Sequence, residues 1–165
     1  MRAYVTGATG FVGSNIAAEF AAAPGTEVHC PVRSEHPDPT LSTEVLDLLD
    51  PDAVAASVDR YGPDVIVHSM ILNDHDLMYA DRRLAWASYV GTTEVLSDAA
   101  NRVGATLILV STDWVFDGTQ GPAAEDTPPN PINLYGVLKM ASELVLGERC
   151  ERGAVARVSG VQGHH

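Results

Sequence analysis

Short β-rich runs alternate with longer stretches of helical periodicity along this chain, and this alternation constrains its fold more than any other feature. Runs such as VIV and LILV are apolar on both faces, which is typical of parallel strands covered by helices on both sides. The sequence therefore predicts an α/β fold, a Rossmann-type doubly wound parallel sheet with strand order 3-2-1-4-5-6 and helices on both faces. The expected strands are 2–6, 26–32, 44–46, 64–70, 105–110 and 154–158, and the expected helices are 11–23, 51–61, 82–103 and 133–150.

Charge and apolar content exclude several classes of partner. The formal net charge is −12, and no cluster of basic residues offsets it, so we expect neither nucleic acid nor an anionic membrane surface to bind. No stretch approaches the roughly 18 apolar residues of a membrane span, and we expect a cytoplasmic protein. Cys30 and Cys150 lie far apart and are interpreted as reduced thiols.

A glycine pattern joins the first strand to the first helix. In TGATGFVG, Gly7, Gly10 and Gly13 allow a tight turn, close approach of a pyrophosphate and close packing of the helix on the sheet. A tight turn without a ligand is the alternative. The position directly after an N-terminal strand favours dinucleotide binding, with the intervening residues as further candidates: Thr9, Phe11 and Val12.

The end of the second expected strand bears on the choice of dinucleotide. An acidic residue there would bind a ribose 2′-hydroxyl, but this strand runs into Arg33 and Ser34, which can hold a 2′-phosphate. Glu35 follows them, and an arginine that is simply solvated is the alternative. We expect NADP(H) in preference to NAD(H).

A tyrosine and a lysine four residues apart open the last expected helix. This spacing puts Tyr135 and Lys139 on one helix face, where the ammonium is expected to lower the phenol's pKa and make it a usable acid at neutral pH. Lys139 is the only lysine in the chain, so a chance match is rare. The pair indicates an enzyme.

Together these motifs resemble the extended short-chain dehydrogenase/reductase family, and most closely its dTDP-4-dehydrorhamnose reductase branch. That branch typically shows S-T-D-Y-V-F-D-G, E-D-x-P-x-N-P and Y-G-x-x-K, and this chain has STDWVFDG, EDTPPNP and YGVLK in the same order. The resemblance covers residues 3 to about 161. It implies that two further groups contact the cofactor: Asp47 and Leu48 after the third strand, and His68, Ser69 and Met70 at the end of the fourth.

The resemblance also implies roles in catalysis. Thr112 would bind the substrate carbonyl beside Tyr135, which would protonate the oxygen that forms as a nicotinamide delivers hydride to a nucleotide-sugar ketone. Lys139 would hold the nicotinamide ribose, and Asp113 and Trp114 would contact the substrate. A hydroxyl pair that merely caps the end of a strand is the alternative interpretation of Ser111 and Thr112.

Several departures leave other functions open. Ser88 stands where the family often has asparagine, and Trp114 where tyrosine is usual. Family members usually continue beyond the sixth strand with much of the substrate pocket, so residues 1–163 are predicted to form the dinucleotide-binding domain without the C-terminal substrate domain. The Pro-rich stretch 121–131 is interpreted as a functional loop, and His164 and His165 as a tag remnant.

The alternatives to a reductase domain are a non-catalytic NADP-binding regulatory subunit and a sugar-nucleotide epimerase or dehydratase. A homo-oligomer, or association with the missing C-terminal part, is also possible on this sequence. No metal site is expected, because the spacing of His68, Asp74, His75 and Asp76 matches no known ligand set.

Overall fold

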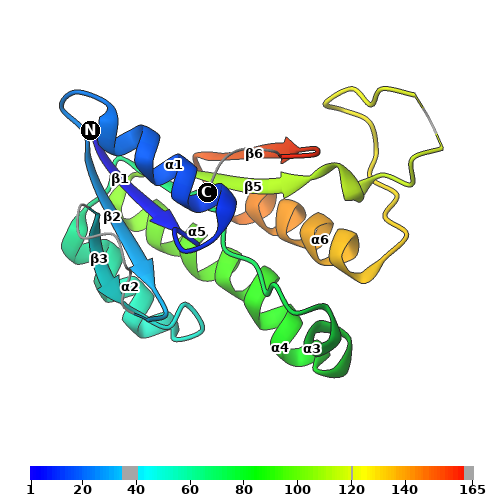
Figure 1. Cartoon of the computed structure of the whole chain (residues 1–165), viewed down its shortest axis with the longest axis horizontal. Coiled ribbons are helices and arrows are strands. Elements are labelled where there is room, and N and C mark those ends of the chain that lie inside the picture. The colour runs from blue at the N-terminus through cyan, green and yellow to red at the C-terminus, as the bar shows by residue number, and fades with distance from the viewer. Residues whose placement is uncertain (35–40, 120, 162–165) are drawn as a thin grey trace.

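The structure, a computed structural model, describes residues 1–34, 41–119 and 121–161. Its centre is a six-stranded parallel sheet in the order β3-β2-β1-β4-β5-β6 (Figure 1), which confirms the predicted fold class and strand order. The strands are β1 Arg2–Thr6, β2 Glu27–Val32, β3 Ser42–Val45, β4 Val65–His68, β5 Thr106–Thr112 and β6 Gly153–Val158.

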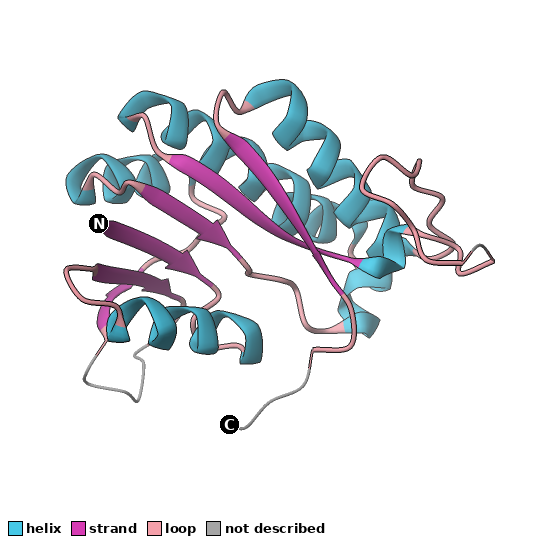
Figure 2. Ribbon diagram, turned by 90° about the horizontal axis from the view of Figure 1, so that it is seen from above, coloured by secondary structure: helices cyan, strands magenta, loops and turns pink. Residues whose placement is uncertain are grey.

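Helices lie against both faces of the sheet (Figure 2). Helix α1 contacts β1 and β2 on one face, whereas α5 and α6 contact β4, β5 and β6 on the other, and α2 packs beside α5. The helices are α1 Phe11–Ala22, α2 Pro51–Tyr61, α3 His75–Ala80, α4 Arg82–Trp86, α5 Thr92–Val103 and α6 Leu134–Arg149.

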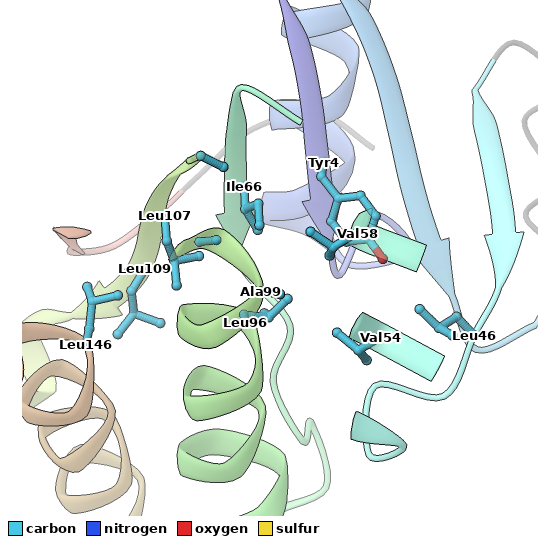
Figure 3. Packing of buried hydrophobic residues seen from close by; sticks show 12 residues of the cluster. Tyr4, Leu46, Val54, Val58, Ile66, Leu96, Ala99, Leu107, Leu109 and Leu146 are labelled. Carbon is cyan, nitrogen blue, oxygen red and sulfur yellow. The ribbon is translucent and has the colours of Figure 1, made fainter. Parts of the chain in front are cut away.

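Alternate residues of the central strands build a core on each side of the sheet. Tyr4, Ile66 and Leu107 belong to the cluster packed against α2, α5 and α6 (Figure 3), while Val5 and Val67 pack on the side of α1. The period of two follows from the pleat of a β-strand, which points successive side chains to opposite faces. Packing of these two clusters holds the strands in position relative to one another. The candidate site lies at their carboxyl ends.

Local capping residues start two helices that frame the site. Asp50 begins α2 by accepting hydrogen bonds from the backbone N–H groups of Asp52 and Ala53, with Pro51 in the first turn. Asn133 begins α6 in the same way, since its Oδ1 accepts from the Gly136 N–H at 2.8 Å. The cap therefore places Tyr135 in the first turn of α6.

The segment predicted as one helix over 82–103 is instead α4, a π-helical turn η1 at Ala87–Gly91, and α5. Side-chain hydroxyls explain the irregular turn: Thr92 Oγ1 donates to the Ser88 carbonyl at 2.7 Å, and Thr93 Oγ1 donates to the Tyr89 carbonyl at 2.7 Å. Such bonds compete with the regular backbone ladder. The prediction of a regular helix was wrong at this turn.

The structure adds one helix that was expected as loop and shifts the bounds of every strand except β1, with β4 ending at His68 rather than at Met70. Helix α3 (His75–Ala80) is capped by Asp74, whose carboxylate accepts from the Leu77 N–H at 2.9 Å. Strand β3 covers 42–45 rather than 44–46, and β5 continues through Ser111 and Thr112 to a 3₁₀ turn η2 at Asp113–Val115.

Apolar side chains are exposed around the β6 end of the molecule. Ile132 is 75% exposed, Leu144 on α6 62% and Val155 on the edge strand β6 41%. Between η2 and α6 the chain leaves the sheet as a long loop (Figure 1).

No helix within the described ranges is long and apolar enough to cross a membrane. The suggested tag residues His164 and His165 lie outside the described residues, as does Glu35.

Candidate functional site

The glycine turn after β1 is packed so closely that side chains would not fit at Gly7 or Gly13. Gly7 has φ +76, and a Cβ there would lie 2.8 Å from the Met70 backbone nitrogen. A Cβ on Gly13 would lie 2.2 Å from the Gly7 carbonyl oxygen. Gly10 caps α1, and its N–H donates to the Gly7 carbonyl at 2.9 Å. The turn leaves the amino end of α1 facing the carboxyl edge of the sheet, the arrangement that binds a pyrophosphate.

Two of the expected β4 residues lie directly beside this turn. Ser69 Oγ donates to the Thr6 carbonyl at 2.7 Å, and the Met70 N–H approaches Thr6 Oγ1 at 3.4 Å. These two contacts connect the turn after β1 to the turn after β4. Thr9 is exposed, while Phe11 and Val12 are partly buried in the first turn of α1.

His68 occupies a different environment from its neighbours. Its ring is fully buried, with Nδ1 2.8 Å from Thr6 Oγ1 and Nε2 3.2 Å from Thr92 Oγ1. Burial and the nearby charge of Lys139 lower the pKa of His68 to about 3, so the ring is neutral. Both ring nitrogens are engaged inside the protein, and a cofactor contact at this position would have to use the backbone.

The residues expected around the adenosine half lie at the ends of β2 and β3. Arg33 and Ser34 follow β2 and are exposed. Asp47 is also exposed, with Oδ1 accepting from the Leu49 N–H at 2.9 Å, and Leu48 is partly buried against the core. These four residues and the glycine turn therefore share the carboxyl edge of the sheet.

Thr112 and Tyr135 meet at the other end of this edge. Thr112 is the last residue of β5, is 6% exposed and accepts a hydrogen bond from the Trp114 N–H at 3.2 Å. Burial raises the pKa of Tyr135, and a hydrogen-bonding interaction with the Thr112 side chain acts in the opposite direction. Gly136 permits this approach, because a Cβ there would lie 2.3 Å from the Trp114 carbonyl oxygen.

Lys139 shares the helix face of Tyr135 but does not act on it as predicted. Its Nζ donates to the Val110 carbonyl at 2.8 Å and lies 5.6 Å from the centre of the Tyr89 ring. The pKa of Tyr135 lies above its ordinary value of 10.0, because burial outweighs the other influences on it. The expectation that Lys139 lowers this pKa is therefore wrong for the protein described here.

Two hollows adjoin these groups. The smaller, about 180 Å³, is lined by Tyr89, Trp114 and Tyr135 together with the segment after β4. The rings of Tyr89 and Trp114 contact Tyr135 edge-on, with centroids 5.9 and 5.8 Å away. The larger hollow, about 1430 Å³, is an open groove between the loop before α6 and the α6–β6 surface, and it reaches Asp113 and Trp114.

The groups predicted to be catalytic thus converge, and the cofactor candidates line the same edge. Asp113 is exposed, and its Oδ2 accepts from Ser159 Oγ at 2.6 Å. Among the described residues no group of three or more His, Cys, Asp or Glu side chains could hold a metal ion.

Comparison with known proteins identifies the family of this chain. The sequence model of the RmlD substrate binding domain matches residues 1–165. The chain therefore belongs to the RmlD substrate binding domain family. It is 38% identical over 162 residues to methionine adenosyltransferase 2 subunit beta of Xenopus laevis, an alignment that covers 98% of this chain and 47% of that protein. It is 34% identical over 116 residues to dTDP-4-dehydrorhamnose reductase of Salmonella typhimurium, covering 70% of this chain and 39% of the relative.

Solved structures of this RmlD-family chain's relatives show the same fold. The dTDP-4-dehydrorhamnose reductase of Bacillus anthracis, in complex with NADP, superposes with a TM-score of 0.82 at 26% identity, over 94% of this chain and 52% of that one. A related structure from Sulfolobus tokodaii gives 0.83, at 26% identity over 95% and 55%. The chain spans about half the length of the relatives it matches.

Two residues that border this region were not predicted from the sequence. Tyr89 comes from the π-helical turn, and its hydroxyl donates to the Leu72 carbonyl at 3.2 Å. Glu143, one turn after Lys139, lies in a buried network with Ser111 and Arg157. The four-residue spacing between Lys139 and Glu143 is visible in the sequence. Ser111 and Arg157, the hydrogen-bonding partners of Glu143, lie far from it along the chain.

Proposed function

We propose that this chain is the cofactor-binding domain of an NADP(H)-dependent reductase that acts on the keto group of a nucleotide sugar. The convergence of Thr112, Tyr135 and Lys139 at the same sheet edge as a glycine turn with no room for side chains at Gly7 and Gly13 carries the proposal. The relatives named dTDP-4-dehydrorhamnose reductase support this substrate class.

The residues present fit a nicotinamide dinucleotide. The turn at Gly7, Gly10 and Gly13 would hold the pyrophosphate with backbone N–H groups and the amino end of α1. Arg33 and Ser34 would hold a 2′-phosphate, and this is the reason for favouring NADP(H) over NAD(H). A bound nicotinamide supplies a hydride for the substrate's carbonyl carbon.

The chain's own residues supply the proton and the alignment. The Tyr135 hydroxyl donates its proton to the carbonyl oxygen as the carbon accepts the hydride, so the ketone becomes an alcohol. Thr112 would orient that oxygen by hydrogen bonding, and Lys139 would hold the nicotinamide ribose of a bound cofactor. Trp114 and Asp113 border the position that the sugar would occupy.

A non-catalytic NADP-binding regulatory subunit is the second candidate. Identity of 38% to methionine adenosyltransferase 2 subunit beta favours it. Turnover separates the two: a regulatory subunit would bind NADP(H) but would not oxidise NADPH with any keto sugar. An epimerase or dehydratase would instead retain bound NAD⁺ through purification.

Gly10→Asp tests cofactor binding at the start of α1. The Gly10 backbone is extended (φ −94, ψ 165), a Cβ there would lie 3.3 Å from the Gly7 carbonyl oxygen, and aspartate is a favourable helix N-cap, so the variant is expected to fold after a small local shift. Its carboxylate would stand where the pyrophosphate binds. We expect the affinity for NADPH, measured by fluorescence titration, to fall by at least about tenfold through like-charge repulsion.

Ala22→Asp provides the matched control, because it adds the same charge at the far end of α1. It should leave the affinity for NADPH within about twofold of the unmodified chain. Unchanged binding in Gly10→Asp would show that the glycine turn is not the pyrophosphate site.

A further inference from the structure

Glu143 is a buried carboxylate that takes no part in the proposed reaction. It is 9% exposed in α6 and accepts hydrogen bonds from Ser111 Oγ on β5 and from the Arg157 guanidinium on β6. Arg157 Nη2 lies 2.7 Å from Oε2, and its Nε lies 3.1 Å from Oε1. The network joins three adjacent elements of the fold (Figure 1).

The Glu143–Arg157 pair is satisfied on both sides, as a buried charge requires. The side chain of Glu143 is 7% exposed and that of Arg157 25%. Arg157 also lies over the Phe116 ring, 5.1 Å from its centre, and its Nη1 approaches the Glu125 carbonyl at 3.5 Å. The pair thereby links α6 to the loop that borders the larger groove.

Glu143 also bears on Lys139, one helical turn away. Lys139 is 3% exposed, and burial lowers its pKa to about 8, while the charge of Glu143 acts to raise it. The other groups around this ammonium are the neutral His68 of β4 and the phenol of Tyr89 in η1, while Tyr135 lies one turn earlier in the same helix. Of these described groups, Glu143 is the one that supplies a negative charge.

We propose that Glu143 is a positioning residue which, held by Ser111 and Arg157, supplies the negative charge one helical turn from the Lys139 ammonium at the end of β5. Ser111 directly precedes Thr112, so the same carboxylate anchors the strand end that carries the carbonyl-binding hydroxyl. This assignment rests on the proposed function, because it presumes that Lys139 meets the cofactor.

Titration of Lys139 by NMR tests the electrostatic part without any turnover. Because Lys139 is the only lysine in the sequence, ¹³C- and ¹⁵N-labelled lysine gives one side-chain signal to follow against pH. Glu143→Gln keeps the shape of the side chain and removes its charge. We expect the titration midpoint of Lys139 to move to lower pH by about 1 pH unit, the usual effect of losing a nearby opposite charge.

Arg157→Gln should move the midpoint in the opposite direction. Removing this cation leaves the charge of Glu143 less compensated, so the lysine should hold its proton to higher pH. Glu148→Gln removes a negative charge from an exposed position on the same helix and should leave the midpoint unchanged. If Glu143→Gln does not fold, the direction of the Arg157→Gln shift alone decides. A Lys139 titration midpoint that is the same in the unmodified chain and in every folded variant would overturn the proposal.

Cofactor affinity measured at two pH values links this charge to binding. If only charged Lys139 binds, Glu143→Gln should weaken NADPH binding little at pH 6.5 but roughly fivefold at pH 8, because fewer molecules are competent at the higher pH. A purely structural defect would weaken binding equally at both pH values, and that result would overturn the positioning role. A shifted NMR midpoint with no NADPH binding in the unmodified chain would instead count against the proposed function.

Discussion

At the scale of single residues, exposed Arg33 is the group that should separate the two nicotinamide dinucleotides. A charge-assisted contact with a 2′-phosphate contributes about 1 to 3 kcal/mol, so NADPH should bind roughly 5- to 150-fold more tightly than NADH. In Arg33→Ala the ratio should fall toward one, mainly through weaker binding of NADPH. Fluorescence titration of both cofactors measures this ratio directly.

Arg152→Ala is the control for this prediction, since Arg152 lies just before β6, at the opposite edge of the sheet, and donates to the Gly104 carbonyl at 2.9 Å. Its loss removes the same charge and should preserve the ratio. Equal affinities of the unmodified chain for NADPH and NADH would contradict the role given to Arg33.

At the scale of elements, the Glu44 side chain links β3 to β2 and α2. Its carboxylate accepts from Ser57 Oγ at 2.6 Å and from Arg60 on α2, and it lies 3.2 Å from His29 Nε2 on β2. Burial acts to raise the pKa of Glu44, but the hydrogen bonds from Ser57, His29 and Arg60 outweigh it, and the net result lies below the ordinary value of 4.5. The ionised Glu44 carboxylate therefore stabilises the folded state at pH values above its ordinary pKa. This stabilisation is lost as the pH falls through the lowered pKa of the folded state.

Glu44→Gln should consequently lower the Tm at pH 7, by about 2 to 4 °C for each kcal/mol lost, and the difference from the unmodified chain should shrink in acid. Differential scanning calorimetry between neutral pH and about pH 3 follows both effects. Glu19→Gln, at an exposed position of α1, serves as the charge-matched control. A Tm difference that is independent of pH would exclude an ionic role for Glu44.

At the scale of the whole molecule, the turn proposed to bind the cofactor is closely packed, while the side proposed to bind the substrate is open. Trp114 is 52% exposed, the groove beside it is wide, and the chain spans about half the length of its relatives. A wide, open groove holds the reacting carbonyl of a substrate in poor alignment. We expect the 165 residues to bind NADPH as a folded domain but to reduce dTDP-4-dehydrorhamnose slowly or not at all, as measured by NADPH oxidation.

Any residual rate should fall by a further factor of about 10² to 10⁴ in Tyr135→Phe, which removes the proposed acid. Efficient turnover by the unmodified chain would refute the need for further substrate-binding residues. A rate that persists unchanged in Tyr135→Phe would place the proton donor elsewhere.

The sequence by itself determined the sheet, its strand order and the glycine turn, because these depend on local periodicity and on backbone space that only glycine leaves. It also placed Tyr135 and Lys139 on one helix face, since that relation is fixed by four-residue spacing.

Only the tertiary structure decided how those groups behave. The pKa of Tyr135 is raised because packing around the ring buries it, and no spacing within α6 reports that burial. The network of Ser111, Glu143 and Arg157 joins residues 32 and 14 positions apart, which meet because β5, α6 and β6 pack side by side. The π-helical turn at Ser88 likewise follows from where the hydroxyls of Thr92 and Thr93 point, and this side-chain choice leaves no trace in the hydrophobic pattern.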